Sequence, residues 1–291
     1  VNSSRIAYSI PFNGGQQELF FRKSDNDVSI ISDLEGLSVS SVADTFSTGI
    51  SLRLADGVSE RLVLGLRLDF RDSQTFLNGE PFAFNLGTLA DNGETQVRVL
   101  RLSGTYSKRG ANYTLRARSR FSFGLDWFGA TENEFDFDGS FVSWLGTLQY
   151  VKQVNENWRF SSELATQLTA DSLLPLEQIA IGGIDSVRGF ERNVRSGDNG
   201  VLLSMELQWS LNQDLALIPF FDLGVFWNND FALEGVDRKV ISPSLLSSLG
   251  MGVRWQLTDA LELQGNLGIP LVRNEEIEQL GTVQLKYRSR F

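Results

Sequence analysis

Apolar and polar positions alternate along most of this chain, which is the pattern of a β-strand with one apolar face and one polar face. The C-terminal residues show it without a break, at the apolar positions Val283, Leu285, Tyr287 and Phe291. Such apolar rows recur along most of the chain, and together they contain more apolar side chains than one protein interior would bury. We therefore expect them to face lipid while the polar rows face a lumen, which predicts an all-β protein, an antiparallel transmembrane β-barrel.

The alternation predicts about thirteen strands in this chain. They are expected at 4–12, 17–30, 44–55, 59–72, 97–109, 112–130, 141–153, 156–170, 200–211, 215–227, 245–257, 260–271 and 280–291. Tight turns and long loops follow each other in this series. Outer-membrane barrels are organised in this way, with the short turns on the periplasmic side.

The first predicted strand, 4–12, leads into a short turn, so its N-terminal end is expected on the outer side. An exported barrel begins in the periplasm, and single-chain bacterial barrels usually have an even number of strands. We therefore expect further strands ahead of Val1, and a gap or a foreign closure between strands 4–12 and 280–291.

Composition excludes several kinds of site. The chain has 291 residues, no Cys and no His, which excludes disulfides, thiol chemistry, imidazole metal sites and Ser-His-Asp centres. We expect no enzyme activity, no metal and no cofactor. A formal net charge of -10 argues against nucleic acid as a partner. No apolar run approaches the roughly 18 residues of a membrane helix.

A long loop, 171–199, carries the sequence Val187, Arg188, Gly189 and Phe190. Glycines on both sides of it allow a tight bend that presents Arg188 and Phe190 together. A guanidinium inside a barrel needs a carboxylate, because an unpaired buried charge is expensive. Asp222 is the candidate, since the alternation of strand 215–227 places it on the lumen face. Gly224 lies on the same face and leaves room.

Three motifs in order resemble the signatures of one outer-membrane superfamily. They are V-R-G-F at 187–190, F-x-D-x-G from Phe220 to Gly224, and G-x-G at Gly250 and Gly252. That superfamily contains the two-partner secretion transporters and the barrel-assembly insertases. The opening segment 8–15 and the loop entry 181–183 are similar to the two-partner secretion branch.

Members of this superfamily have sixteen strands with POTRA domains ahead of them. The resemblance therefore implies that residues 1–291 are the barrel portion, with N-terminal strands and POTRA domains absent from this chain. It also implies that the loop folds back into the lumen and that Arg188 engages Asp222. On the barrel wall, this contact would be lined by Phe220, Gly224, Gly250 and Gly252. The C-terminal assembly signal would be Phe291. The alternative is that Arg188 and Asp222 form a permanent brace with no role in transport.

Charged residues are expected to line the lumen, chiefly Arg67, Arg116, Arg118, Arg120 and Arg254, with Asp69, Glu163 and Glu206. They would form a hydrated path for a polar unfolded polypeptide and would favour anions. The simpler interpretation is that lumen residues need only be polar. Acidic clusters at 132–138 and 275–278 are interpreted as solvated surface rather than Ca²⁺ sites.

The sequence thus predicts a transporter in a bacterial outer membrane, of Gram-negative or cyanobacterial type, that exports a secreted polypeptide without a cofactor. The lipid bilayer and, through the C-terminal strand, the barrel-assembly machinery are the other expected partners. Three alternatives are open. An insertase would need a weak seam between the first and last strands, a diffusion porin would show a large open conductance, and a barrel lipase would need the His that this chain lacks.

Overall fold

The computed structural model describes residues 2–31, 38–82, 93–131, 139–229, 244–258, 260–272 and 281–287. They form one large antiparallel sheet, a two-stranded sheet of β10 (Ile179–Ile181) and β11 (Arg195–Gly197), and one short 3-10 helix, η1 (Asn13–Gly15). The strands are β1 (Asn2–Phe12), β2 (Gln17–Ile31), β3 (Ser38–Asp56), β4 (Glu60–Leu77), β5 (Glu80–Pro81), β6 (Glu94–Arg109), β7 (Tyr113–Gly124), β8 (Val142–Gln153), β9 (Trp158–Thr169), β10 (Ile179–Ile181), β11 (Arg195–Gly197), β12 (Asn199–Ser210), β13 (Leu215–Trp227), β14 (Ser244–Thr258), β15 (Leu261–Pro270) and β16 (Gly281–Tyr287).

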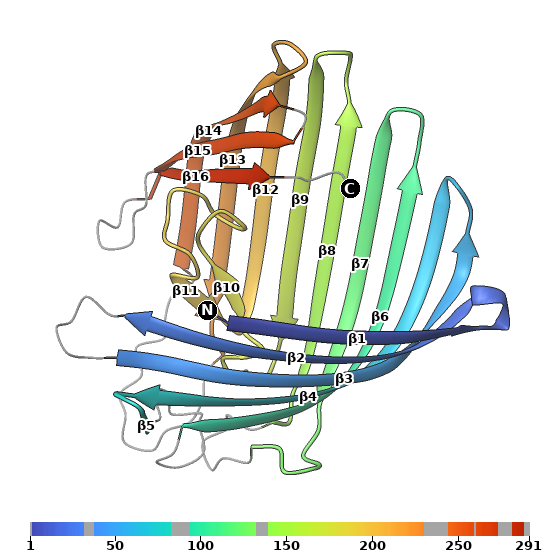
Figure 1. Cartoon of the computed structure of the whole chain (residues 1–291), viewed down its shortest axis with the longest axis vertical. Helices are drawn as coiled ribbons and strands as arrows, with labels where there is room; N and C mark the ends of the chain where they lie inside the picture. Colours follow the sequence, from blue (N-terminus) through green and yellow to red (C-terminus); the bar gives the residue numbers. More distant parts are fainter. Residues whose placement is uncertain are drawn as a thin grey trace.

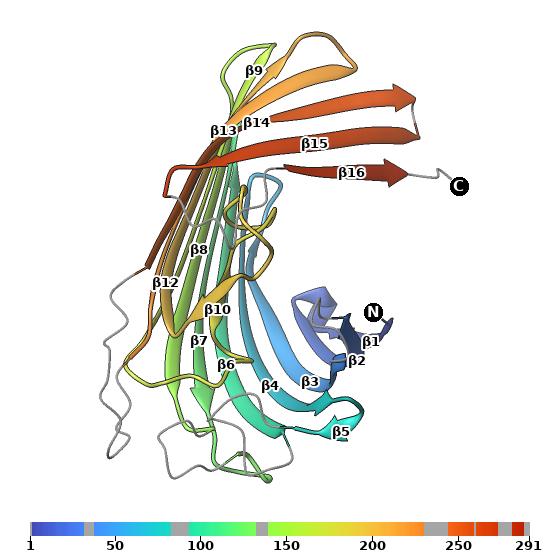
Figure 2. The ribbon, with the colours of Figure 1, turned by 90° about the vertical axis from the view of Figure 1, so that its left-hand side faces the viewer.

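The long strands pair in the order β1-β2-β3-β4-β6-β7-β8-β9-β12-β13-β14-β15-β16 (Figure 1). This confirms the predicted series of thirteen strands, to which β5 adds a short partner for β4. The sheet curves strongly, and β1 and β16 are its two edges (Figure 2). No pairing joins these edges in the part of the chain that the structure describes, which agrees with the predicted gap. Whether further strands precede Val1 stays a prediction.

The two faces of the sheet follow the sequence alternation. On β4 the apolar Leu64 and Leu66 are 39% and 44% exposed on the convex face, whereas Asp69 is 2% exposed on the concave face. On β13 every second residue, from Ala216 to Phe226, is buried. An exposed apolar row is stable only against lipid or another apolar surface, so the concave face is the lumen side.

Some strand boundaries differ from the prediction. β3 begins at Ser38 and β4 extends to Leu77, beyond the predicted limits of 44 and 72. These ends pair through the main chain, with Ser40 opposite Phe76. Because main-chain pairing needs no apolar side chain, alternation alone underestimates the length of such strands. The strands β5, β10 and β11 have two or three residues each, too few for a periodic pattern.

The strand predicted at 112–130 was too long, because β7 ends at Gly124. Leu125 and Trp127 continue the apolar alternation, but positive φ angles of 55° at Phe128 and 73° at Gly129 turn the chain out of the sheet. The Ala130 N–H then donates to the Trp127 carbonyl at 3.2 Å, which closes a turn.

The loop 171–199, called the lumen loop below, lies on the concave face (Figure 2). Two apolar clusters pack it there. One joins Ile181, Val187 and Phe190 of the loop to Phe226 and Leu246 of the wall. The other joins Leu173 and Leu174 of the loop to Val97, Val99 and Phe141. Burial of apolar surface thus holds the loop against the sheet at two places, its tip and its base.

Several predicted features lie outside the described residues. They are the C-terminal Phe291 and the acidic clusters at 132–138 and 275–278. Within the described ranges, no helix has the length and apolar composition needed to cross a membrane.

Candidate functional site

The lumen loop forms a folded hairpin. β10 and β11 pair near its base, with Ile179 opposite Gly197. At the tip, Gly182 and Gly183 have φ angles of 111° and 88°, a conformation that favours glycine. The Gly182 N–H donates to the Ser186 hydroxyl at 2.7 Å. The predicted tight bend is present, and it directs Arg188 toward the sheet.

Arg188 contacts Asp222 of β13 through both its side chain and its backbone. Its Nε and Nη2 atoms donate to Oδ2 and Oδ1 of Asp222 at 2.7 and 2.8 Å, and its backbone N–H donates to Oδ2 at 3.1 Å. Asp222 is fully buried and Arg188 is 8% exposed. The ion pair expected from the sequence is therefore present as a bidentate, buried contact, the strongest geometry for these groups.

Two residues of β12 complete this contact. The Ser204 hydroxyl, opposite Asp222 in the sheet, donates to Asp222 Oδ1 at 2.7 Å. Glu206 Oε1 accepts from Arg188 Nη1 at 2.6 Å. Sequence analysis named Glu206 only as a lumen charge and gave Ser204 no role in the contact. Their lumen-facing positions are readable from the alternation, but the register of β12 on β13 is not. We call Arg188, Ser204, Glu206 and Asp222 the tip clamp.

An aromatic platform lies beneath the guanidinium. Arg188 Cζ is 3.6 Å from the centroid of the Phe220 ring, a close cation–π contact. Phe220 lies opposite Gly250 of β14, and a Cβ added at Gly250 would overlap the Phe220 ring. Gly250 thus acts indirectly: it gives Phe220 room to lie flat on the wall beneath Arg188.

Glycines on the wall differ in what they contact. A Cβ at Gly224 would lie 2.9 and 3.0 Å from Ile181 and Val187 of the loop, so this glycine admits the loop as predicted. A Cβ at Gly252 would meet Asn266 and Ile218 of the wall, which places Gly252 beside the contact rather than in it.

Gly268 of β15 makes a loop contact that sequence analysis missed. A Cβ there would lie 2.6 Å from Gly189 N and 2.8 Å from Arg188 C. The backbone of the V-R-G-F motif therefore lies directly on the backbone of β15. Gly268 pairs with Gly250 across the sheet. That register, which the sequence does not reveal, brings it to the loop.

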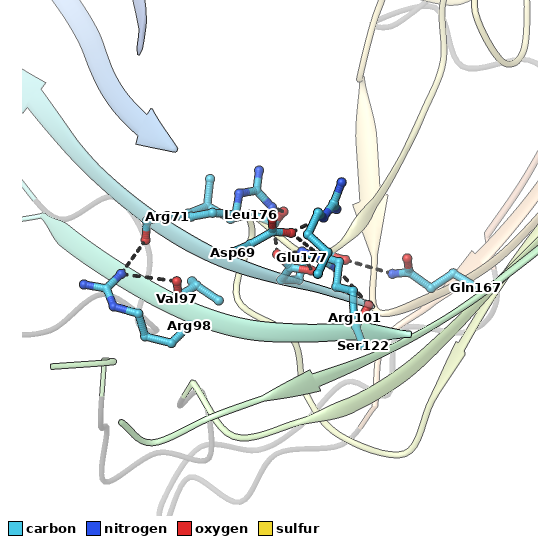
Figure 3. A network of polar contacts seen from close by, with 10 residues as sticks. Asp69, Arg71, Val97, Arg98, Arg101, Ser122, Gln167, Leu176 and Glu177 are labelled. Carbon is cyan, nitrogen blue, oxygen red and sulfur yellow. Dashed lines mark hydrogen bonds and ion pairs between the residues drawn. The ribbon is translucent and has the colours of Figure 1, made fainter. Parts of the chain in front are cut away.

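A second polar network holds the base of the lumen loop (Figure 3). Arg101 of β6 donates from Nη2 to both oxygens of Glu177, at 2.7 and 2.9 Å, and Arg71 of β4 donates to Glu177 Oε1 at 2.7 Å. Arg101 also donates to Asp69 Oδ2 at 2.6 Å and to the Ser122 hydroxyl at 2.7 Å. We call Asp69, Arg71, Arg101 and Glu177 the base anchor. Of these four residues, sequence analysis names only Asp69 as a lumen charge.

The lumen arginines predicted from the sequence differ in their partners. Arg67 reaches Asp69 Oδ2 at 2.9 Å, and Arg254 donates to Gln208 at 2.9 Å. Arg116, Arg118 and Arg120 have no hydrogen bond or ion pair with another described residue. Among the described residues no group of acidic side chains is placed to hold a metal ion. What the geometry provides is a loop fixed at two points inside a charged, concave wall.

Comparison with known proteins gives matches over parts of longer chains. The outer membrane transporter CdiB of Escherichia coli O6:K15:H31 (strain 536 / UPEC) is 37% identical over 97 residues, which are 31% of this chain and 16% of that protein. The solved structure of CdiB from Escherichia coli has a TM-score of 0.74 at 20% identity, over 97% of this chain and 52% of that one.

BamA from Haemophilus ducreyi lacking POTRA domains 1-3 has a TM-score of 0.63 at 14% identity, over 98% of this chain and 62% of that one. At such identities, the two solved structures establish the fold alone. The chain spans about half the length of the solved CdiB chain. The model of the haemolysin secretion/activation proteins ShlB/FhaC/HecB matches residues 1–254. Since this match covers well over half of the chain, the chain belongs to the ShlB/FhaC/HecB family of haemolysin secretion/activation proteins.

Proposed function

We propose that the protein containing this chain exports a partner polypeptide across the bacterial outer membrane through the lumen of its barrel. The observation that carries the proposal is the lumen loop, held on the concave wall by a buried Arg188–Asp222 pair. The family match and the name of the curated relative, an outer membrane transporter, support the same function.

In this proposal the tip clamp sets the shape of the export path. Arg188 is held by two carboxylates and lies on Phe220, so the loop tip keeps one position while chain passes beside it. Gly224 and Gly268 let the loop approach the wall, and Gly250 makes room for Phe220. The substrate is a secreted polypeptide in extended form, and its folding outside would drive movement.

The contacts of the protein with the membrane follow from its surface. The exposed apolar rows of the convex face contact the lipid bilayer. The C-terminal strand with Phe291 would be recognised by the barrel-assembly machinery during insertion. A diffusion porin is less well supported, because a porin needs an open pore and a loop fixed on the lumen face of the wall narrows that pore. A barrel-assembly insertase has the support of a shared fold.

Export by the full-length protein in cells tests this function. Arg188→Ala removes the guanidinium from two carboxylates, so secretion of the partner should fall at least tenfold at an unchanged level of barrel in the membrane. The matched control is Arg192→Ala in the same loop, since Arg192 is 73% exposed at its side chain and pairs only with exposed Asp185. Equal secretion by wild type and Arg188→Ala would contradict the proposal. It would favour the alternative that Arg188 and Asp222 form a permanent brace with no role in transport.

A further inference from the structure

The concave face of β2, β4, β6 and β7 carries two contrasting groups of arginines, in addition to Arg67, which pairs with Asp69 at 2.9 Å, and Arg116. Those of the first group, Arg71 and Arg101, are held by carboxylates at 2.6 to 2.7 Å. Those of the second group, Arg22, Arg118 and Arg120, have no hydrogen bond or ion pair with another described residue. The first group anchors the loop through its carboxylate partners. The second group does not anchor the loop, so its arginines are available to bind a ligand.

The second group lines one cavity of about 410 Å³. Five arginines contribute to it, together with a single carboxylate, and these are Arg22, Arg67, Arg101, Arg118, Arg120 and Glu18. Glu18 is already directed to Arg53, at 3.5 Å. Small residues keep the space open, since Ser103 lies opposite Arg120 and Gly65 lies opposite Ser103. The cavity therefore has a positive charge that the described residues do not neutralise.

Two of these guanidinium groups also carry unused donors. The Nε atoms of Arg67 and Arg120 are buried and have no hydrogen-bond partner among the described residues. A buried donor without an acceptor is costly. Two such donors beside one cavity make it suited to a ligand that brings an acceptor.

The neighbouring part of the wall, on β8, β9 and β12, has the opposite character. A second cavity, of about 620 Å³, lies beside the tip clamp and is lined by Glu163, Asp185 and Glu206 as well as by Arg188. Repulsion from these carboxylates and attraction to the arginines would direct an anionic ligand to the wall formed by β2, β4, β6 and β7.

We propose that Arg22, Arg67, Arg118 and Arg120, the arginine cavity, bind carboxylates of an acidic segment in the polypeptide that passes through the lumen. Guanidinium groups match carboxylates in bidentate geometry, and several of them side by side suit successive Asp or Glu residues of an extended chain. The proposal rests on the proposed function, because export brings such a chain into the lumen.

A binding experiment on the full-length protein in detergent tests this site without requiring export. The probes are fluorescently labelled oligoglutamate and oligolysine peptides of equal length, followed by anisotropy. Oligoglutamate should bind and oligolysine should not. The double variant Arg118→Gln/Arg120→Gln should raise the Kd for oligoglutamate about tenfold or more. Added salt should weaken the wild-type binding, because the contact is ionic.

Arg116→Gln is the matched control, because Arg116 lies on the same face of β7 but lines neither the arginine cavity nor the cavity at the tip clamp. Its Kd should stay within about twofold of wild type. The single variant Arg118→Gln removes an exposed side chain that has no partner among the described residues, so it tests the site even if the double variant folds poorly.

Three outcomes would overturn the site. The first is equal binding of both peptides, and the second is an unchanged Kd in the arginine variants. The third is displacement of oligoglutamate by inorganic phosphate at a concentration equal to that of the peptide's carboxylates, which would indicate a site for simple anions. Failure of the export test with normal peptide binding would reject the proposed function and leave the site. If export depends on Arg188 but no peptide binds, the arginine cavity is rejected as a binding site and the proposed function stands.

Discussion

The tip clamp and the base anchor hold the same loop with opposite distributions of charge. At the tip, one loop guanidinium meets two wall carboxylates, Asp222 and Glu206. At the base, one loop carboxylate, Glu177, meets two wall guanidinium groups, Arg71 and Arg101. The tip therefore depends on a single buried cation, whereas the base distributes its contacts over several cations.

This difference affects how each attachment responds to the loss of one group. Removing Asp222 leaves Arg188 with one carboxylate, Glu206, which is 33% exposed at its side chain, and with the Ser204 hydroxyl at 3.2 Å. Removing the charge of Glu177 leaves Arg101 with Asp69 and Ser122. The tip should be the more sensitive of the two attachments, because an uncompensated buried charge costs more than one lost bond in a network that keeps others.

The largest effect is expected from Asp222→Ala. It leaves a buried guanidinium without its bidentate partner, at a cost of about 3–5 kcal/mol. Because the chain has no Cys, one introduced thiol can report release of the loop, and Val187→Cys places it at a fully buried position of the tip. Thiol modification at this position should accelerate about a hundredfold or more in the Asp222→Ala background.

The control for this measurement is the same reporter in an Arg192→Ala background. Arg192 forms an exposed pair with Asp185, worth about 0–1 kcal/mol, so the rate should change little. A rate in Asp222→Ala that equals the control rate would mean that the apolar cluster, rather than the ion pair, holds the tip.

A smaller effect is expected from Glu177→Gln. The amide keeps the shape but removes the charge that Arg71 and Arg101 share, at a cost of about 1–3 kcal/mol. A thiol at the buried position of Leu174 should then react about tenfold faster, while one at Val187 should react at the wild-type rate. Equal acceleration at both positions would show that the two attachments open together and would remove the distinction drawn between them.

The sequence predicted the tip better than the base for a physical reason. Short motifs contain Val187 to Phe190, Asp222 and Gly224, and the alternation of strand 215–227 also gives the direction of Asp222. Glu177 lies in a loop segment without periodicity, and its partners Arg71 and Arg101 come 106 and 76 residues earlier, so the pairing exists only after the loop has folded inward. Ser204 and Gly268 reach the site through strand register, which alternation does not specify.

The strand series was predicted well for the same reason. Apolar rows are imposed by lipid along the middle of each strand, so β13 matches its predicted limits of 215–227. At the strand ends this constraint is absent, and β3, β4 and β7 differ there from the prediction.

The most direct test of the central claim, that the lumen loop occupies the pore, is the conductance of the full-length protein in planar bilayers with and without residues 180–195. These residues include the loop tip, and deleting them removes Arg188 together with its apolar cluster. The wild-type protein should give small, flickering currents, and the deletion should give larger, steady steps, because the lumen wall itself is polar and wet. Equal conductance before and after the deletion would contradict this claim and would favour a diffusion porin.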